Sequence, residues 1–151
     1  MACRLGLLLA VIIAIGIIPS ASAIKEVDDA MRMGSIYFDK GDCSAAVSAY
    51  DRAIRLEPDN AVIWNRKAVA LSRQGSLDAA VETYGKATVL DPTNDLYWDN
   101  KGETLTELGK YAEAVESFDK AIGIKPTYAY YYQNKASALE GQENHTAAIE
   151  I

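Results

Sequence analysis

The stretch from residue 95 to residue 128 reads DLYWDNKGETLTELGKYAEAVESFDKAIGIKPTY, and its pattern recurs along the chain at a fixed interval of 34. Trp64, Trp98 and Tyr132 follow one another at this interval. Further columns keep the same step: Tyr50, Tyr84 and Phe118; Ala53, Ala87 and Ala121; Pro58, Pro92 and Pro126; Gly41, Gly75 and Gly109; and Ala46, Ala80, Ala114 and Ala148. A period of this length indicates a helical solenoid, in which each repeat packs only against its neighbours.

Inside the quoted stretch, small and apolar residues recur at the three- and four-residue spacing of a buried helix face. They are Trp98, Gly102 and Leu105 in a first helix, and Ala114, Phe118 and Ala121 in a second. Gly109 between them allows a tight turn, and Pro126 stops the second helix. Each repeat is therefore predicted to be a helix hairpin, and we expect the Trp64, Trp98 and Tyr132 rings to fill the space between helices.

These residues resemble the motif of the tetratricopeptide repeat family. The motif positions are filled in the third unit by Trp98, Gly102, Leu105, Gly109, Tyr111, Ala114, Phe118, Ala121 and Pro126. The resemblance covers residues 27–151, and it implies an all-α, right-handed α-solenoid of helix-turn-helix repeats. Three repeats are complete, at residues 27–60, 61–94 and 95–128, and a partial fourth covers residues 129–151.

The fourth unit departs from the pattern. We expect a first helix over residues 129–142, a turn near His145 and a short second helix from residue 146 to residue 151. Glu143 stands where a turn glycine is expected, although Gly141 is close. No counterpart of Phe118 follows, and no polar capping helix closes the stack, which solenoids usually need for solubility. This open end is a candidate surface for self-association or for docking on a larger scaffold.

The first 23 residues resemble a secretory signal peptide. Arg4 precedes an apolar run over residues 5–18, and Ala21-Ser22-Ala23 supplies the small residues of a cleavage site. The alternative is an uncleaved membrane anchor, because residues 5–23 are nearly long enough to cross a bilayer. Cleavage after Ala23 is favoured, and the expected location is outside the cytoplasm, either secreted or in the cell envelope.

Charge and cysteine content exclude several functional classes. The chain has 15 basic and 21 acidic residues, so loss of Arg4 leaves 14 and 21, a net charge of −7. Without a basic cluster, such a chain would be repelled by nucleic acid. Cys43 would be the only cysteine after cleavage, so no internal disulfide is expected.

Residues able to catalyse a reaction are scarce. His145 is the only histidine, and the sequence holds no phosphate-binding loop or paired-cysteine metal motif. We therefore predict neither an enzyme nor a cofactor or metal site. Asn144-His145-Thr146 matches the acceptor pattern for N-glycosylation, but Asn144 or Thr146 serving as a helix cap is the better interpretation.

The family resemblance implies a binding groove on the concave surface, lined by the first helix of each repeat. The predicted contact residues are Phe38, Asn65, Val69, Leu96, Asp99, Glu103, Thr106, Tyr130, Gln133 and Ser137. The residues at the groove positions do not form the lysine, asparagine and arginine clamp with which some family members hold a carboxylate. The acidic Asp99 and Glu103 instead predict a protein or peptide partner with basic or amide side chains.

The tyrosines at positions 128, 130, 131 and 132 leave an alternative open. Exposed aromatic rings can act as stacking platforms, so Tyr128–Tyr132 could bind a glycan or a cell-envelope polymer. Packing between repeats is the favoured interpretation of the cluster as a whole, and only Tyr130 is expected to face the groove clearly. A tyrosine there offers a rigid contact surface and a hydrogen-bonding hydroxyl.

Overall fold

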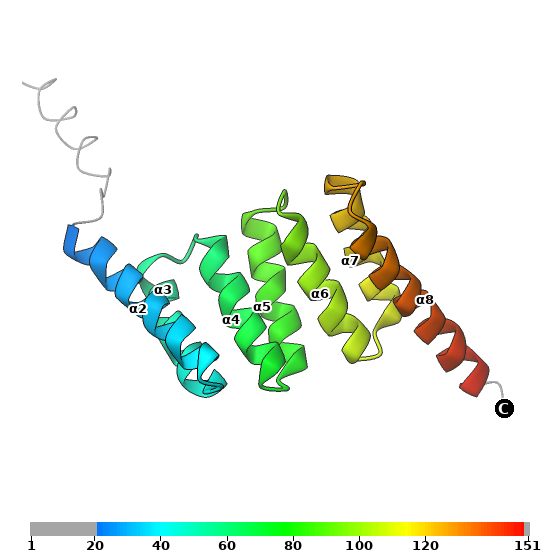
Figure 1. The fold of residues 1–151 in the computed structure, drawn as a ribbon, viewed down its shortest axis with the longest axis horizontal. Helices are drawn as coiled ribbons and strands as arrows, with labels where there is room; N and C mark the ends of the chain where they lie inside the picture. Colours follow the sequence, from blue (N-terminus) through cyan, green and yellow to red (C-terminus); the bar gives the residue numbers. More distant parts are fainter. Residues whose placement is uncertain (1–20, 150–151) are drawn as a thin grey trace, which may run out of the picture.

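The computed structural model describes residues 21–149, and their side chains from residue 22 to residue 143. The described part contains seven helices and no strand. They are α2 (Ala21–Asp39), α3 (Cys43–Leu56), α4 (Ala61–Arg73), α5 (Leu77–Leu90), α6 (Asp95–Glu107), α7 (Tyr111–Ile124) and α8 (Ala129–Ile149). Consecutive helices stand side by side in chain order and form one elongated row (Figure 1). The predicted all-α repeat solenoid is confirmed.

Each complete repeat is a hairpin closed by the same turn. The turn glycines Gly41, Gly75 and Gly109 have φ values of 82°, 85° and 74°, in the left-handed region that other residues avoid. In the first turn the amide of Gly41 bonds to the Phe38 carbonyl at 3.0 Å. The amide of Asp42 bonds to the Tyr37 carbonyl at 2.9 Å. These bonds satisfy carbonyls that the end of the helix leaves free, and the glycine column therefore fixes the hairpin geometry.

Asparagine caps start the first helices of the second and third repeats. Asn60 accepts a bond from the Val62 amide at 3.1 Å, and Asn94 accepts one from the Leu96 amide at 3.2 Å. Each cap satisfies an amide that has no partner within the helix. The proline column lies just before these caps, in the loop that joins one repeat to the next.

The tryptophan column joins successive repeats in a way that the sequence analysis did not anticipate. The Trp98 indole N–H donates to the Pro92 carbonyl at 3.0 Å, and Trp64 makes the same bond to Pro58 at 2.6 Å. The Tyr132 hydroxyl repeats it with Pro126 at 3.0 Å. The prediction that these rings fill the space between helices was wrong for Tyr132, which is exposed, whereas Trp64 and Trp98 are partly buried. The buried aromatic is the preceding residue, Tyr97 or Tyr131.

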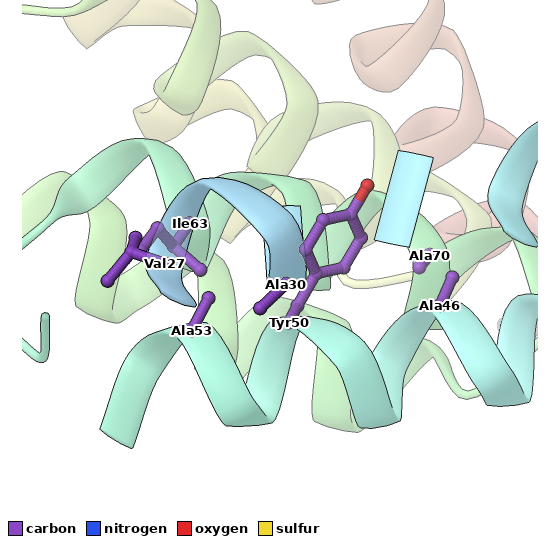
Figure 2. Packing of buried hydrophobic residues seen from close by; sticks show 7 residues of the cluster. All are labelled: Val27, Ala30, Ala46, Tyr50, Ala53, Ile63 and Ala70. Carbon is purple, nitrogen blue, oxygen red and sulfur yellow. The ribbon is translucent and has the colours of Figure 1, made fainter. Parts of the chain in front are cut away.

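Small residues bring the two helices of a repeat together. A Cβ atom at Gly102 would lie 2.6 Å from the Phe118 ring, and one at Gly34 would lie 2.4 Å from the Tyr50 ring. The first helix can therefore approach the aromatic ring of the second only where a small residue faces it. At the amino-terminal end, Tyr50 belongs to a buried cluster that unites α2, α3 and α4 through Val27, Ala30, Ala46, Ala53, Ile63 and Ala70 (Figure 2).

The fourth unit is one helix and not a hairpin. The predicted turn near His145 and the second helix after it were wrong, because α8 runs without a break from Ala129 to Ile149. Glu143 replaces the glycine that turns the chain in the other repeats, so nothing there favours a left-handed backbone. Gly141 lies inside the helix against the Tyr111 ring. Asn144 is accordingly a mid-helix residue and not a helix cap, and no side chain beyond residue 143 is described.

The predicted signal peptide lies mostly outside the described residues. Only Ala21, Ser22 and Ala23 are described, and they form the first turn of α2. Cleavage after Ala23 would shorten α2 by three residues and keep its buried Val27 and Ala30. From residue 21 to residue 149, no helix combines the length and hydrophobicity needed to span a bilayer.

Candidate functional site: a groove along the first helices

Three hollows follow one another along the first helices, and together they define the groove. The first is lined by Phe38, Tyr50, Val62, Asn65, Arg66 and Val69. The middle hollow is lined by Phe38, Val69, Ser72, Arg73, Tyr84, Asn100, Glu103, Thr104 and Glu107. The third is lined by Glu103, Thr106, Glu107, Phe118, Asn134 and Ser137. Shared residues connect each hollow to the next, so the groove runs from α2 to α8.

The three hollows are similar in size and follow one another along the groove. Their volumes are about 290, 280 and 280 Å³. A row of connected hollows suits an extended chain that places one side chain in each.

Asparagines join neighbouring first helices along the floor of the groove. The Asn100 amide donates to the Asn65 amide oxygen at 3.2 Å, which links α6 to α4. One repeat later, the Asn134 amide donates to Asp99 at 3.0 Å and to Glu103 at 3.2 Å, which links α8 to α6. Asn100 and Asn134, which are 34 residues apart, therefore act as hydrogen-bond donors between repeats.

Asp99 is part of this floor and does not project into the groove. The prediction that Asp99 is exposed to a ligand in the groove was wrong, because its exposed fraction is only 5%. Helix α8 packs over this position, and its Asn134 provides the donor that a buried carboxylate requires. Burial raises the pKa of Asp99 from 3.8 to about 6, and the Asn134 hydrogen bond opposes that rise.

Glu103 and Tyr130 form a polar contact at the surface of the groove. The Tyr130 hydroxyl donates to the Glu103 carboxylate at 3.0 Å, across from α8 to α6. This hydrogen bond raises the pKa of the Tyr130 hydroxyl. Glu103 also accepts a hydrogen bond from Asn134. It therefore lies at the centre of a hydrogen-bond network that joins α6 to α8.

An exposed apolar column runs along one edge of the groove. Val62, Leu96 and Tyr130 occupy equivalent positions of successive repeats, and their exposed fractions are 45%, 53% and 46%. Three successive first helices thus present a large apolar side chain near their amino-terminal ends. Such a repeated apolar edge offers contacts at regular steps to an extended partner.

Of the predicted groove residues, most meet at the three hollows. Phe38, Asn65, Val69, Glu103, Thr106 and Ser137 line them, whereas Leu96 and Tyr130 form the exposed edge. Gln133 is exposed and lines none of the three hollows. The groove assignment as a binding surface stays a prediction.

Three charged residues of the groove were missed by the sequence analysis. Arg66, Arg73 and Glu107 line the hollows but were not among the predicted contact residues. The predicted contacts on each helix lie along a single line of positions, whereas the face of a helix spans about 100° and includes neighbouring positions. Arg66 directly follows Asn65 and Glu107 directly follows Thr106, so a wider face would have included both.

The tyrosine cluster does not form one flat surface. Tyr131 is fully buried, and its hydroxyl donates to Asp95. The rings of Tyr128 and Tyr130 lie 6.2 Å apart and are tilted by 57°. The Tyr132 hydroxyl is held at the Pro126 carbonyl. The rings therefore point in different directions, which is unlike a continuous platform for stacking a sugar chain.

Comparison with known proteins agrees with this architecture. A profile described as tetratricopeptide repeat matches residues 31–95, and one described as TPR repeat matches residues 102–142. The chain belongs to the tetratricopeptide repeat (TPR) family. No protein of curated function matches the sequence significantly.

Solved TPR domains have the same fold. A complex of the TPR2B domain of yeast Sti1 with pHsp70 has a TM-score of 0.72 and 25% identity, over 77% of this chain and 98% of that chain. The Sgt2 TPR domain from Aspergillus fumigatus has a TM-score of 0.75 and 21% identity, over 87% and 86% of the two chains. The second TPR domain of human RPAP3, in complex with the HSP70 peptide SGPTIEEVD, has a TM-score of 0.73 and 21% identity, over 77% and 97%.

Proposed function

We propose that this protein is a non-enzymatic interaction module that binds an extended segment of a partner protein in the groove. The observation that carries the proposal is the unbroken row of hollows over α2, α4, α6 and α8, edged by exposed apolar side chains. Similar TPR domains of Sti1 and RPAP3 are described in complex with Hsp70 or its peptide. Glu103 and Tyr130 are the contacts on which we expect binding to depend most.

The test compares a charge reversal in the groove with a matched reversal elsewhere. The immobilised protein captures partners, which are identified by mass spectrometry, and overlapping peptides of each partner are then titrated. Glu103→Lys should lose the binding peptide, whereas Glu116→Lys on an exposed site of α7 should keep it. Equal affinity of both variants and the wild type would reject the groove. Binding of soluble polysaccharide without any peptide would favour the glycan alternative.

We further propose that the protein acts outside the cytoplasm. Support comes from the order of Arg4, the apolar run over residues 5–18 and the small residues Ala21-Ser22-Ala23. Amino-terminal sequencing of the protein from its native source should give Ile24 as the first residue. A full-length chain in the membrane fraction would indicate an anchor, and a full-length chain in the cytosol would overturn the proposal.

Self-association through α8 is a second candidate. Ala136 and Leu139 are exposed, although their counterparts in the third repeat, Gly102 and Leu105, are buried. A second copy of the chain would cover this apolar face. Sedimentation over a hundredfold range of protein concentration should then reveal a dimer that Leu139→Glu abolishes, while a monomer at every concentration would eliminate this candidate.

A further inference from the structure

Equivalent positions of the groove carry opposite charges in the second and third repeats. Arg73 in α4 and Glu107 in α6 occupy the same place in successive repeats, and both line the middle hollow. Arg66 adds a second cation beside the first hollow, whereas Glu103 adds a second anion between the middle and third hollows. The groove therefore changes sign within a single repeat step.

The two arginines keep their charge available for a ligand. The Arg66 guanidinium contacts only a neutral group there, the Ser35 hydroxyl, at 3.3 Å. The Arg73 guanidinium lies over the Phe38 ring, 4.8 Å from its centre. Within residues 22–143, neither arginine has a carboxylate oxygen within 4.0 Å. A stacked or neutral contact orients a guanidinium without neutralising it.

The acidic half is equally free of cations. Glu103 accepts hydrogen bonds from Tyr130 and Asn134, and both donors are neutral. Glu107 is exposed, and across the described side chains no lysine or arginine nitrogen lies within 4.0 Å of either glutamate. Both halves of the groove therefore keep charges that a ligand of opposite sign can neutralise.

Apolar surface adjoins the cationic half. Phe38, Val62 and Val69 surround the first hollow beside Arg66. A bulky apolar side chain placed there would remove water from around the guanidinium, which strengthens its attraction to a carboxylate. The preferred ligand at this end therefore combines an acidic side chain with a neighbouring apolar one.

We propose that the groove selects an extended peptide whose charges are segregated, with acidic residues over α2 and α4 and basic residues over α6 and α8. The inference rests on the proposed function and specifies the chemistry of its partner. Adjacent packed helices lie about 10 Å apart and an extended residue spans about 3.3 Å, so about nine residues reach from α2 to α8. Opposite charges at the two ends would fix the register of such a peptide.

Two nine-residue peptides of identical composition test the proposal by calorimetry against the full chain. The block peptide, Asp-Glu-Leu-Ser-Gly-Ser-Leu-Lys-Lys, has its acidic residues at one end and its basic residues at the other. The mixed peptide is Asp-Lys-Leu-Ser-Gly-Ser-Leu-Lys-Glu. Both peptides are acetylated at the amino terminus and amidated at the carboxyl terminus. We expect the block peptide to bind at least tenfold more tightly at low salt. The advantage should shrink as salt is raised to about 0.5 M, where screening shortens the reach of charges to about 4 Å.

Matched variants place the effect in the groove. Arg66→Glu with Arg73→Glu should abolish the preference for the block peptide. Arg52→Glu with Arg55→Glu, which makes the same change on exposed sites of α3, should keep it. A block peptide with Asn-Gln in place of Asp-Glu should bind weakly and should not distinguish the groove variant from the wild type. An effect of the arginine substitutions that disappears when the peptide lacks its acidic residues would show that the arginines contact those residues directly.

The outcomes separate the two proposals. Equal binding of block and mixed peptides, with both lost in the groove variant, would overturn charge selection while leaving peptide binding in the groove intact. Failure of both peptides to bind would also overturn charge selection. If Glu103→Lys also captured partners as the wild type does, the proposal that a peptide binds in the groove would be overturned as well.

Discussion

The third repeat and the fourth unit place equivalent positions of their first helices in two different surroundings. In the third repeat, α7 covers α6, so Leu105 is fully buried and Gly102 lies against Phe118. In the fourth unit no second helix covers α8 within the described residues, so Leu139 is 41% exposed and Ala136 is exposed. The comparison shows that the partner helix decides what a motif residue does. Equivalent substitutions should therefore have unequal effects.

The largest difference is expected between Leu105→Ala and Leu139→Ala. Removing a fully buried leucine leaves a cavity and costs about 2–5 kcal/mol, whereas an exposed leucine should cost less than about 0.5 kcal/mol. Urea unfolding of the two variants measures both values. Similar losses would mean that α8 is covered in solution, which would in turn support self-association through this face.

The junction between the two units should respond to pH through Asp99. Folding raises the pKa of Asp99 from 3.8 to about 6, so between these values the folded chain binds the proton more tightly and stability falls as pH rises. Asp99→Asn removes this penalty. The difference in the free energy of unfolding between the variant and the wild type should therefore grow in the variant's favour by about 1–3 kcal/mol as the pH rises from about 4 to about 7. Thermal unfolding at both pH values measures the gain, and parallel curves would contradict it.

A smaller effect should follow loss of the hydrogen bond between the first helix and the preceding loop. Trp98→Phe removes the indole donor to Pro92, and Tyr132→Phe removes the hydroxyl donor to Pro126. One hydrogen bond contributes about 0.5–1.5 kcal/mol, and Trp98→Phe also shortens a half-buried ring. We therefore expect Trp98→Phe to lower the free energy of unfolding more than Tyr132→Phe does. The reverse order would show that the loop before α8 depends more on its bond.

The smallest expected effect compares two helical glycines. A Cβ at Gly85 in α5 meets nothing within 4 Å, so Gly85→Ala should stabilise the protein by about 0.4–1 kcal/mol by restricting the unfolded chain. A Cβ at Gly141 in α8 would lie 2.4 Å from the Tyr111 ring, which must then move. Gly141→Ala should gain less or lose stability. An equal gain in melting temperature for both would show that the Tyr111 ring yields freely.

The repeat architecture could be predicted from the sequence because the period is set by local rules. The glycines at positions 41, 75 and 109 fix the turns, and the spacing of small and aromatic residues fixes the packed faces. These signals act between residues of the same repeat, so the sequence of a single repeat is enough to predict its fold. The end of the chain was predicted less well, because absence of a turn glycine at position 143 left the helix free to continue.

The groove could be predicted only in outline. Periodicity placed Phe38, Asn65 and Glu103 on the right helices, but burial of Asp99 depends on where α8 lies. Likewise, nothing in the local sequence shows that Arg73 stacks on Phe38 and leaves Glu107 without a cation. Such features arise between repeats, where contacts join residues that are distant in the sequence.

The bond from each tryptophan column residue to the preceding proline has a consequence for how this protein can change in length. Donor and acceptor are six residues apart and recur every 34. Excision of residues 61–94 would join Asn60 to Asp95 and place Trp98 six residues after Pro58. Trp98 could then donate to the Pro58 carbonyl in place of the lost Trp64. Loss of a whole unit is therefore structurally conservative. It would nevertheless take away Arg66 and Arg73, leaving a shorter protein whose groove no longer changes sign.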